Sequence, residues 1–389
     1  MTKTYKIMIV AGESSGDAHA AALVRELRKK SPDANLEFFG ATGAKMREAD
    51  VETVLNADDL AIVGLPEIAR ALPMFWNAFQ TLKKTAIERK PDAVILVDFP
   101  DFNLKLAKTL KKAGLQIIYY ISPQLWAWRK YRVKTIEKYV DLLLTILPFE
   151  KNWYRARGIS HVEYVGNPLA GEVFAKFGRE EFCAKYNLDS DKPIIALLPG
   201  SRHKEIVKIL PPMVETASLM ARENSEIQFV VALGSTRRLA ETKAEIENAR
   251  KKNPKLPRVL ITVCGETREA LKAADAAAVK SGTATLETAI IGTPLAIVYK
   301  TSALNYKLLR PLISVPHFGL VNLAAGKRLA KEFIQDAFTA RNLSQELFRL
   351  LTPETNREMR ERLKEITESL SGGAAELAAK AILKKIKSE

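Results

Sequence analysis

The chain of 389 residues contains only two cysteines, Cys183 and Cys264. Neither has metal-ligating neighbours, so a disulfide scaffold and a cysteine zinc site are excluded and a reducing cytoplasm is expected. None of the four histidines stands at metal-ligand spacing from another, and we expect neither a metal ion nor a cofactor. No apolar run approaches the ~18 residues that a membrane-spanning helix needs. The early run Ile7–Ala11 is too short for a signal peptide, so we expect a soluble, unprocessed chain.

The sequence has fewer acidic than basic residues. Lysine and arginine number 60 against 45 aspartates and glutamates, a net charge of +15. This excess suits nucleic acid, an acidic membrane surface or a phosphorylated substrate, and it equally suits plain solubility. Because the basic residues are dispersed and no RNA-binding motif with stacked aromatics is visible, we expect no nucleic-acid partner. Apolar residues make up 47% of the chain, which excludes a disordered protein.

Both halves of the chain alternate short apolar runs with amphipathic stretches, a pattern typical of parallel sheets covered by helices on both faces. The strands expected in the first half are Lys6–Ala11, Leu36–Phe39, Ala93–Val97, Gln116–Ile121, Leu142–Leu147 and Val162–Val165. Those expected in the second half are Ile194–Leu198, Ile227–Ala232, Val259–Val263, Ala276–Val279 and Leu295–Val298. The helices expected between strands include Asp17–Lys30, Leu104–Ala113, Pro211–Glu223, Arg237–Lys252 and Thr283–Ile291.

The turn residues 166–168 mark the seam between the halves. We predict an α/β fold of two Rossmann-like, doubly wound parallel-sheet domains that face each other across a cleft, followed by a helical C-terminal tail. The predicted domains are residues 1–166 and 167–345, with helices in 346–389 that could pack back on the N-terminal domain. In such sheets ligands bind at the carboxyl ends of strands, so the motifs found there deserve a functional interpretation.

Two motifs follow strands of the first half. Residues 11–17, AGESSGD, open a helix with small side chains that would let an anion approach backbone N–H groups. The spacing differs from G-x-G-x-x-G, which disfavours NAD, and a tight turn with Asp17 as N-cap is the alternative. Residues 98–103, DFPDFN, place Asp98 where a tuned carboxylate could act as a general base. Asp101 or Asn103 would then cap the following helix.

A third motif, SPQLWAWR at 122–129, puts two tryptophans and an arginine after a strand. Flat aromatic rings stack on sugars or pack against acyl chains. Alternatively, at least one of the two tryptophans fills the core between the domains.

Two loops of the second half, LPGSRHKEI at 198–206 and KSGTATLE at 280–287, each join a strand to a helix. Backbone amides, hydroxyls and one arginine suit a diphosphate, and a glutamate one turn into the second helix could accept both ribose hydroxyls. N-caps followed by surface residues are the alternative, and no Walker A motif is present. The residues expected to contact a nucleotide diphosphate are Gly200, Ser201, Arg202, Ser281, Gly282, Thr283 and Glu287.

A helix is also predicted around residues 65–79, where apolar and aromatic residues keep helical spacing and a basic cluster follows. This pattern fits either a core helix or an interfacial helix at a membrane. Its apolar positions are Leu65, Ile68, Leu72, Phe75, Trp76 and Phe79.

Taken together, these motifs resemble the lipid-A-disaccharide synthase family of inverting GT-B glycosyltransferases. The resemblance runs from Ile9 to about Lys331 and includes LPFEK at 147–151 and NLAAG at 322–326. Two positions depart from the family pattern. Asn167 stands where the family usually has a histidine, and Val321 replaces the proline common before Asn322.

The resemblance implies transfer of 2,3-diacylglucosamine from UDP-2,3-diacylglucosamine to 2,3-diacylglucosamine 1-phosphate, giving a β-1,6-linked disaccharide 1-phosphate and UDP. It implies a donor site in the C-terminal half and an acceptor site on the N-terminal half. Asp98 is then the candidate base, and Asn322 joins the donor-site residues. The residues expected at the acceptor are Glu13, Ser15, Gly16, Ser122, Trp126 and Arg129.

The family also implies peripheral attachment to the cytoplasmic face of a Gram-negative inner membrane, an anionic surface that residues 62–79 and the positive charge would meet. A homodimer is left open. The alternatives are a UDP-N-acetylglucosamine 2-epimerase, a peptidoglycan glycosyltransferase and a non-catalytic lipid-binding protein. An epimerase should carry no lipid-facing helix, and the peptidoglycan enzyme lacks the SPQLWAWR loop.

Overall fold

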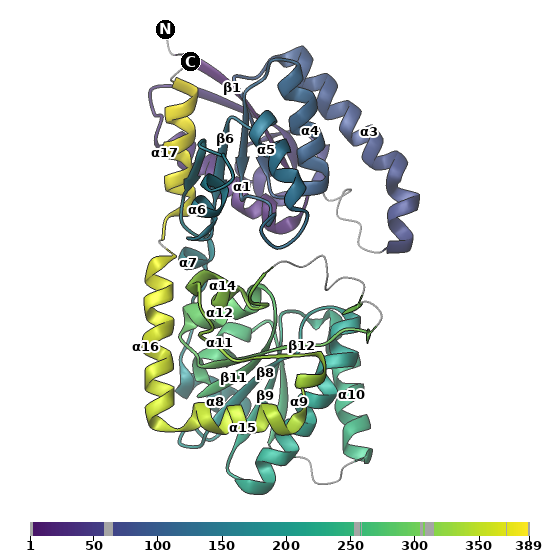
Figure 1. Cartoon of the computed structure of the whole chain (residues 1–389), viewed down its shortest axis with the longest axis vertical. Coiled ribbons are helices and arrows are strands. Elements are labelled where there is room, and N and C mark those ends of the chain that lie inside the picture. Colours follow the sequence, from purple (N-terminus) through teal and green to yellow (C-terminus); the bar gives the residue numbers. More distant parts are fainter. Residues whose placement is uncertain are drawn as a thin grey trace. The chain divides into compact units, whose positions relative to one another are not determined.

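The structure is a computed structural model that describes residues 3–57, 65–252, 257, 259–303, 306–307, 315–370 and 372–387. The chain divides into two compact units (Figure 1). The first comprises residues 1–168 together with 370–389, and the second comprises residues 169–369. The division falls at the end of the predicted seam 166–168, two residues beyond the predicted domain boundary, and the predicted C-terminal tail is shared between the two units.

The first unit contains a seven-stranded parallel sheet in the order β3-β2-β1-β4-β5-β6-β7. Its strands are β1 Thr4–Ala11, β2 Asn35–Thr42, β3 Glu52–Asn56, β4 Ala93–Val97, β5 Ile117–Tyr120, β6 Leu142–Thr145 and β7 Val162–Tyr164. Ile9 pairs with Gly40 on one side and with Ile95 on the other. The strand order reverses between β1 and β4, so the loops that follow these two strands flank the topological switch point of the sheet.

Both faces of this sheet are covered. Alternate residues of β4 enter different cores, with Ile95 and Val97 in one and Val94 and Leu96 in the other. The first core is closed by α1 Ser14–Lys29 and α17 Ala374–Lys387 (yellow in Figure 1). The second is closed by α3 Leu65–Arg89, α4 Pro100–Lys112, α5 Val133–Tyr139 and α6 Glu150–Arg155. Burial on both faces explains why the strands are continuous apolar runs in the sequence.

Asn167 lies at the end of the first unit's initial segment and is buried. Its backbone N–H donates to the Leu370 carbonyl at 2.8 Å, and its side-chain amide donates to the Ile146 carbonyl at 3.1 Å. The Tyr164 hydroxyl donates to the same Leu370 carbonyl at 2.8 Å. Asn167 therefore ties the point where the chain leaves the first unit to the point where it returns.

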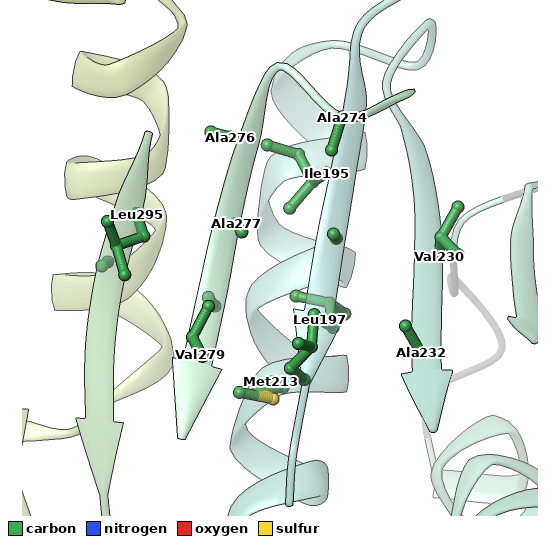
Figure 2. Close-up of a cluster of buried hydrophobic side chains, with 14 of the residues drawn as sticks. Ile195, Leu197, Met213, Val230, Ala232, Ala274, Ala276, Ala277, Val279 and Leu295 are labelled. Atoms are coloured by element: carbon green, nitrogen blue, oxygen red, sulfur yellow. The ribbon is translucent and has the colours of Figure 1, made fainter. Parts of the chain in front are cut away.

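The second unit contains a six-stranded parallel sheet in the order β10-β9-β8-β11-β12-β13. Its strands are β8 Ile194–Leu198, β9 Gln228–Leu233, β10 Leu260–Cys264, β11 Ala276–Lys280, β12 Leu295–Tyr299 and β13 Glu332–Ile334. Its helices are α7 Leu169–Glu172, α8 Arg179–Tyr186, α9 His203–Glu223, α10 Leu239–Lys252, α11 Thr267–Ala273, α12 Thr283–Ile291, α14 Leu320–Ala325, α15 Ala340–Leu351 and α16 Pro353–Ser369. Figure 2 shows Met213 of α9 beside Leu197 of β8 in the buried core. The order of this sheet reverses between β8 and β11, which places their loops at its switch point.

The prediction of two Rossmann-like parallel-sheet domains with C-terminal helices is confirmed. Three helices begin earlier than predicted, α1 at Ser14, α4 at Pro100 and α9 at His203, so that Pro211 lies inside α9. The edge strands β3 and β13 were not predicted. Among the described helices, none combines the length and the apolar character that crossing a membrane requires.

Candidate active site

Asp98 follows β4 at the switch point of the first sheet. Asp98 and Phe99 have positive φ angles of 47° and 49°. Left-handed backbone is costly for residues with a side chain and persists where the surroundings fix it, often at functional sites. Here the Asp98 N–H donates to the Tyr120 carbonyl at 3.0 Å. The Asp98 carbonyl accepts from the Tyr119 hydroxyl at 2.6 Å and from the Asn103 amide at 2.8 Å. The turn is therefore held from three sides.

The carboxyl group of Asp98 is largely buried. Burial and the nearby negative charge of Glu13 raise its pKa to about 6, while the Phe99 N–H and His19 act in the opposite direction. No ion pair joins Asp98 to a lysine or arginine of the described part of the chain. A carboxyl with such a pKa can accept a proton from a hydroxyl near neutral pH.

Gly12 and Gly16 stand where α1 meets the sheet, and Gly12 has no room for a side chain. A Cβ atom at Gly12 would lie 2.3 Å from Cδ1 of Phe99, so only glycine leaves room for this ring. Gly16 is buried, but a Cβ there would make only ordinary contacts, 3.6 Å from Cβ of Ala11 and 3.8 Å from the Val97 carbonyl oxygen. Glu13 and Ser15 are exposed. The small residues of this motif therefore admit a neighbouring side chain, while Glu13 and Ser15 are accessible to a ligand.

The interpretation of Asp17 as the N-cap of its own helix is wrong, because Glu13 occupies the N-cap of α1. The Asp17 side chain is buried and accepts hydrogen bonds from the N–H groups of Gly43 at 2.8 Å, Lys45 at 2.7 Å and Met46 at 3.1 Å. It thereby caps the short helix α2, Ala44–Arg47, on a different part of the chain.

Neither Asp101 nor Asn103 caps α4, contrary to the sequence-based expectation, because Phe99 occupies the N-cap and Asn103 is buried. The Asn103 amide donates to the carbonyls of Val97 and Asp98. The Asp101 carboxylate instead forms an ion pair with Arg129 at 2.6 Å and another with Arg132.

Ser122 and Trp126, both predicted at the acceptor, are buried and turned toward Glu150. The Ser122 hydroxyl and the Trp126 indole N–H donate to one Glu150 oxygen at 3.1 and 2.9 Å. The other oxygen accepts from the N–H groups of Ile146 and Leu147 at 3.0 and 2.9 Å. Burial raises the pKa of Glu150, although these donors act against the rise. Glu150 thus organises the loop; the sequence-based reasoning missed this role, although the residue lies in the LPFEK motif.

Phe149 and Glu150, both of the first unit, surround Trp126, and the Phe149 ring centroid lies 5.1 Å from that of Trp126. Trp128, by contrast, is exposed. The guanidinium of Arg129 lies 4.1 Å from the centroid of the Trp128 ring. The two tryptophans of this loop therefore have different environments, one structural and one open to a ligand.

In the second unit, a cavity of about 450 Å³ opens at the switch point of the sheet. It is lined by seven of the eight predicted donor residues, namely Gly200, Ser201, Arg202, Ser281, Gly282, Thr283 and Glu287. The structure adds four polar lining residues that were not predicted to bind the donor, namely Glu205, Thr267, Arg268 and Lys280.

The amides of Ser201 and Arg202 are already occupied, so of the Gly200 and Ser201 amides expected to face a diphosphate, that of Ser201 is used within the protein. Both donate to the same oxygen of Glu205, at 2.9 and 3.1 Å. Lys280 lies 2.8 Å from the other oxygen. Burial alone would raise the pKa of Glu205, but Lys280 and the two amides bring it below its usual range. Gly200 has φ 113°, and a Cβ there would lie 2.4 Å from the Glu205 carboxylate.

At the second loop, Gly282 occupies the N-cap of α12 with φ 147° and brings no side chain to cover the first amides of the helix. The Ser281 hydroxyl is committed to the Phe318 carbonyl at 2.6 Å. Glu287 forms an ion pair of 3.4 Å with Arg268. An anionic ligand in this cavity would therefore meet the start of α12 and a set of cations.

Asn322 does not line the cavity and is fully buried. Its amide donates to the Ala330 carbonyl at 2.8 Å and to Glu332 at 2.9 Å. Its side-chain oxygen accepts from the N–H groups of Leu329 and Ala330 at 2.9 and 2.8 Å. These bonds fix the turn that precedes β13, and a direct contact between Asn322 and the donor stays a prediction.

The apolar residues of α3 differ in exposure. Leu72 and Trp76 are 60% and 62% exposed. The side chains of Leu65 and Ile68, also predicted at a membrane, lie outside the described residues. Leu72 and Trp76 therefore form an exposed apolar pair on α3.

Phe75 and Phe79 are half-buried and join α3 to the loop that carries Asp98 and to the helix α4 that follows it. The Phe75 ring centroid lies 6.4 Å from that of Phe99, and the Phe79 centroid lies 6.0 Å from that of Phe102. They contribute to the core as well as to the surface. Among the described residues, no cluster of histidine, cysteine and carboxylate side chains could hold a metal ion.

Residues 7–386 match a family model described as Lipid-A-disaccharide synthetase. The chain is 43% identical over 383 residues to the Lipid-A-disaccharide synthase of Syntrophus aciditrophicus, covering 98% of both chains. It is 41% identical over 373 residues to that of Trichlorobacter lovleyi, covering 95% of this chain and 94% of the relative.

Among solved structures, the UDP-GlcNAc 2-epimerase from Neisseria meningitidis bound to UDP-GlcNAc has a TM-score of 0.62 and 13% identity, covering 97% of this chain and 100% of that one. A glycotransferase of kitacinnamycin also has a TM-score of 0.62, with 14% identity over 98% of this chain and 99% of that one. At these identities the likeness concerns the fold alone, and the fold is that of the two-domain GT-B proteins.

Proposed function

The chain belongs to the lipid-A-disaccharide synthase family and is a glycosyltransferase, and on this premise we propose that Asp98 is the base of an inverting transfer. The donor is UDP-2,3-diacylglucosamine and the acceptor is 2,3-diacylglucosamine 1-phosphate. The observation that carries the assignment is a largely buried carboxyl with a pKa of about 6, in a strained turn at the switch point of the first sheet.

The reaction is a single displacement. Asp98 takes the proton of the acceptor 6-hydroxyl as the oxygen attacks the anomeric carbon of the donor sugar. The bond between that carbon and the UDP oxygen breaks, and its electron pair leaves with UDP. Attack from the face opposite the leaving group gives the β-1,6 linkage with inversion.

The leaving group develops negative charge on its phosphates. Arg202, Lys280 and the N-terminus of α12 around Thr283 all line the donor cavity and would stabilise this charge electrostatically. Glu287 would accept the ribose hydroxyls, with Arg268 holding its side chain. Fixed cations and helix amides of this kind supply the stabilisation that a divalent metal ion provides elsewhere.

The acceptor would lie against the loops after β1, β4 and β5. Glu13 and Ser15 are exposed beside the Asp98 turn, and Arg129 with Trp128 extends this surface. We assign Ser122 and Trp126 a positioning role through Glu150, because their polar groups are used in that contact. Asn322 likewise acts by holding the backbone of the turn before β13, while a contact of Gly16 with the acceptor stays a prediction.

Both substrates carry acyl chains and reside in a bilayer. We propose that the chain binds peripherally to the cytoplasmic face of the inner membrane, with Leu72 and Trp76 entering the interface. The net charge of +15 favours an anionic leaflet.

The test is UDP release in detergent micelles containing UDP-2,3-diacylglucosamine, with and without 2,3-diacylglucosamine 1-phosphate. We expect release only when the acceptor is present, together with a disaccharide 1-phosphate by mass spectrometry. Release without the acceptor would favour hydrolysis or an epimerase-like reaction. Asp98→Asn should bind UDP like the wild type but turn over several orders of magnitude more slowly, and near-normal turnover would remove Asp98 from the mechanism.

A further inference from the structure

Two guanidinium groups meet on one carboxylate beside the proposed base. Arg129 lies 2.6 Å from Oδ1 of Asp101, and Arg132 pairs with the same oxygen. Asp101 is the second residue of α4, while Arg129 precedes and Arg132 ends the short turn Lys130–Arg132 that follows the β5 loop. We call these three residues, Asp101, Arg129 and Arg132, the arginine cluster.

The charges of this cluster do not balance. Two positive groups face one negative group, so one positive charge stays uncompensated. The Asp101 side chain is 65% exposed, whereas that of Arg132 is only 18% exposed. An exposed ion pair contributes little to stability, and two like charges beside each other repel. The arrangement instead presents two planar donor groups, held in place, to an anion with several acceptor oxygens.

The cluster is rigidly held. Arg129 has a positive φ of 56°, a strained value for a residue with a side chain, and its guanidinium is stacked on Trp128 at 4.1 Å from the ring centroid. The cluster also lies near Asp98. Tyr119 donates to the Asp98 carbonyl. Burial is the main cause of its raised pKa, and the charges of Asp98, Arg132 and Asp101 also affect that pKa.

We propose that Arg129 and Arg132, oriented by Asp101, bind the phosphate monoester of the acceptor and make that phosphate a determinant of specificity. The inference rests on the proposed function. In an acceptor glucosamine 1-phosphate, C1 and C5 flank the ring oxygen. C1 carries the phosphate, and C5 carries the carbon that bears the 6-hydroxyl. With the hydroxyl at Asp98, the phosphate therefore lies within about one ring width of the base.

Such a phosphate needs counter-charge at this site. It would bring up to two negative charges toward Asp98 and Glu13, whose own negative charges already repel each other. A bidentate contact with two guanidiniums offsets this repulsion. A headgroup phosphate of a membrane lipid has the same chemistry, so the experiment must separate the two sources.

The experiment measures transfer in micelles of a neutral detergent with two acceptors, 2,3-diacylglucosamine 1-phosphate and the same lipid without its phosphate. Arg132→Gln should raise KM for the phosphorylated acceptor about 10- to 100-fold, the value of one or two charge-assisted hydrogen bonds, with kcat near wild type. Its KM for the acceptor without phosphate should equal that of the wild type. Arg132→Lys keeps the positive charge but loses the planar guanidinium donors. Its KM for the phosphorylated acceptor should lie between those of the wild type and Arg132→Gln. Lys112→Gln removes the same charge at the far end of α4 and should change neither KM.

An equal loss on both acceptors would mean that Arg132 is structural and would overturn the proposal. An unchanged KM combined with weaker binding to vesicles of phosphatidylcholine and phosphatidylglycerol would overturn it in favour of a lipid headgroup. If Arg132→Gln loses its native circular dichroism, Arg129→Gln carries the same test. A wild type that transfers sugar to neither acceptor would instead contradict the proposed function itself.

Discussion

The ammonium group of Lys280 lies 2.8 Å from the carboxylate of Glu205 in the second unit. Lys280 ends β11 and Glu205 lies in the first turn of α9, so the pair joins the two loops of the donor cavity. The same carboxylate holds the amides of Ser201 and Arg202. Glu205 therefore acts as a built-in anion at the start of α9, and it leaves the start of α12 as the helix terminus available to a phosphate.

Glu205→Ala should weaken UDP binding about tenfold, because the Gly200–Arg202 loop loses the acceptor that orders it and Arg202 loses its orientation. Isothermal titration calorimetry with UDP measures the effect. Glu226→Gln is the matched control, since Glu226 pairs with Lys192 away from the cavity. Tighter UDP binding by Glu205→Ala would show that the carboxylate competes with the diphosphate rather than ordering the loop.

The acidic limb of the profile of kcat/KM against pH should follow Asp98. The base must be unprotonated, and its pKa of about 6 predicts a tenfold fall in kcat/KM per pH unit below that value. Glu13→Gln removes the negative charge that helps raise this pKa, so the limb should move to lower pH. A limb that stays in place in Glu13→Gln would assign it to another group.

The ionised form of Asp98 should lower the free energy of unfolding at the pH where this residue acts as the base. Its pKa is raised on folding to about 6, so its favourable contribution is present below about pH 4 and is lost as pH rises through 6. Asp98→Asn should therefore be more stable than the wild type at pH 8 by on the order of 1–2 kcal/mol, after allowing for its partial exposure. The difference should vanish near pH 4. Urea unfolding at both pH values checks this, with the exposed Asp33→Asn as a control that should show no such dependence.

The apolar residues of α3 should separate into two functions. Leu72→Ser combined with Trp76→Ser should reduce flotation with anionic liposomes while changing stability little, because both side chains are exposed. Phe79→Ser should instead destabilise the first unit by roughly 1–3 kcal/mol, because its ring packs against Phe102. Unchanged flotation of the Leu72 and Trp76 double variant would place the membrane contact elsewhere.

The sequence predicted the central strands well because both of their faces are buried. Ala93–Val97 and Ile194–Leu198 are apolar throughout, and the structure gives them these bounds. The edge strand β13 is three residues long and carries Glu332, so it lacks such a pattern. The helix predicted to begin at Pro211 begins at His203, because the contact of Glu205 with the Ser201 and Arg202 amides fixes its first turn.

The site was predicted at the level of loops but not of individual atoms. Sequence spacing places Trp126 after β5, yet it cannot tell that the indole N–H is used by Glu150, 24 residues away. Asp17 likewise caps a helix from a different segment. Such partners come from the tertiary fold, so a polar residue at a strand end is identified more easily than the direction in which its side chain points.

The docking of α17 on α1 has a consequence for synthesis on the ribosome. The core of the first unit includes Ala378, Ile382 and Ile386 from this helix. These residues are translated only after the whole of residues 169–369, the second unit. One hydrophobic face of the first sheet therefore stays partly uncovered during synthesis, while the second unit can already fold. Nascent chains that stall within residues 169–369 are thus expected to expose this face and to become substrates for chaperones and proteases.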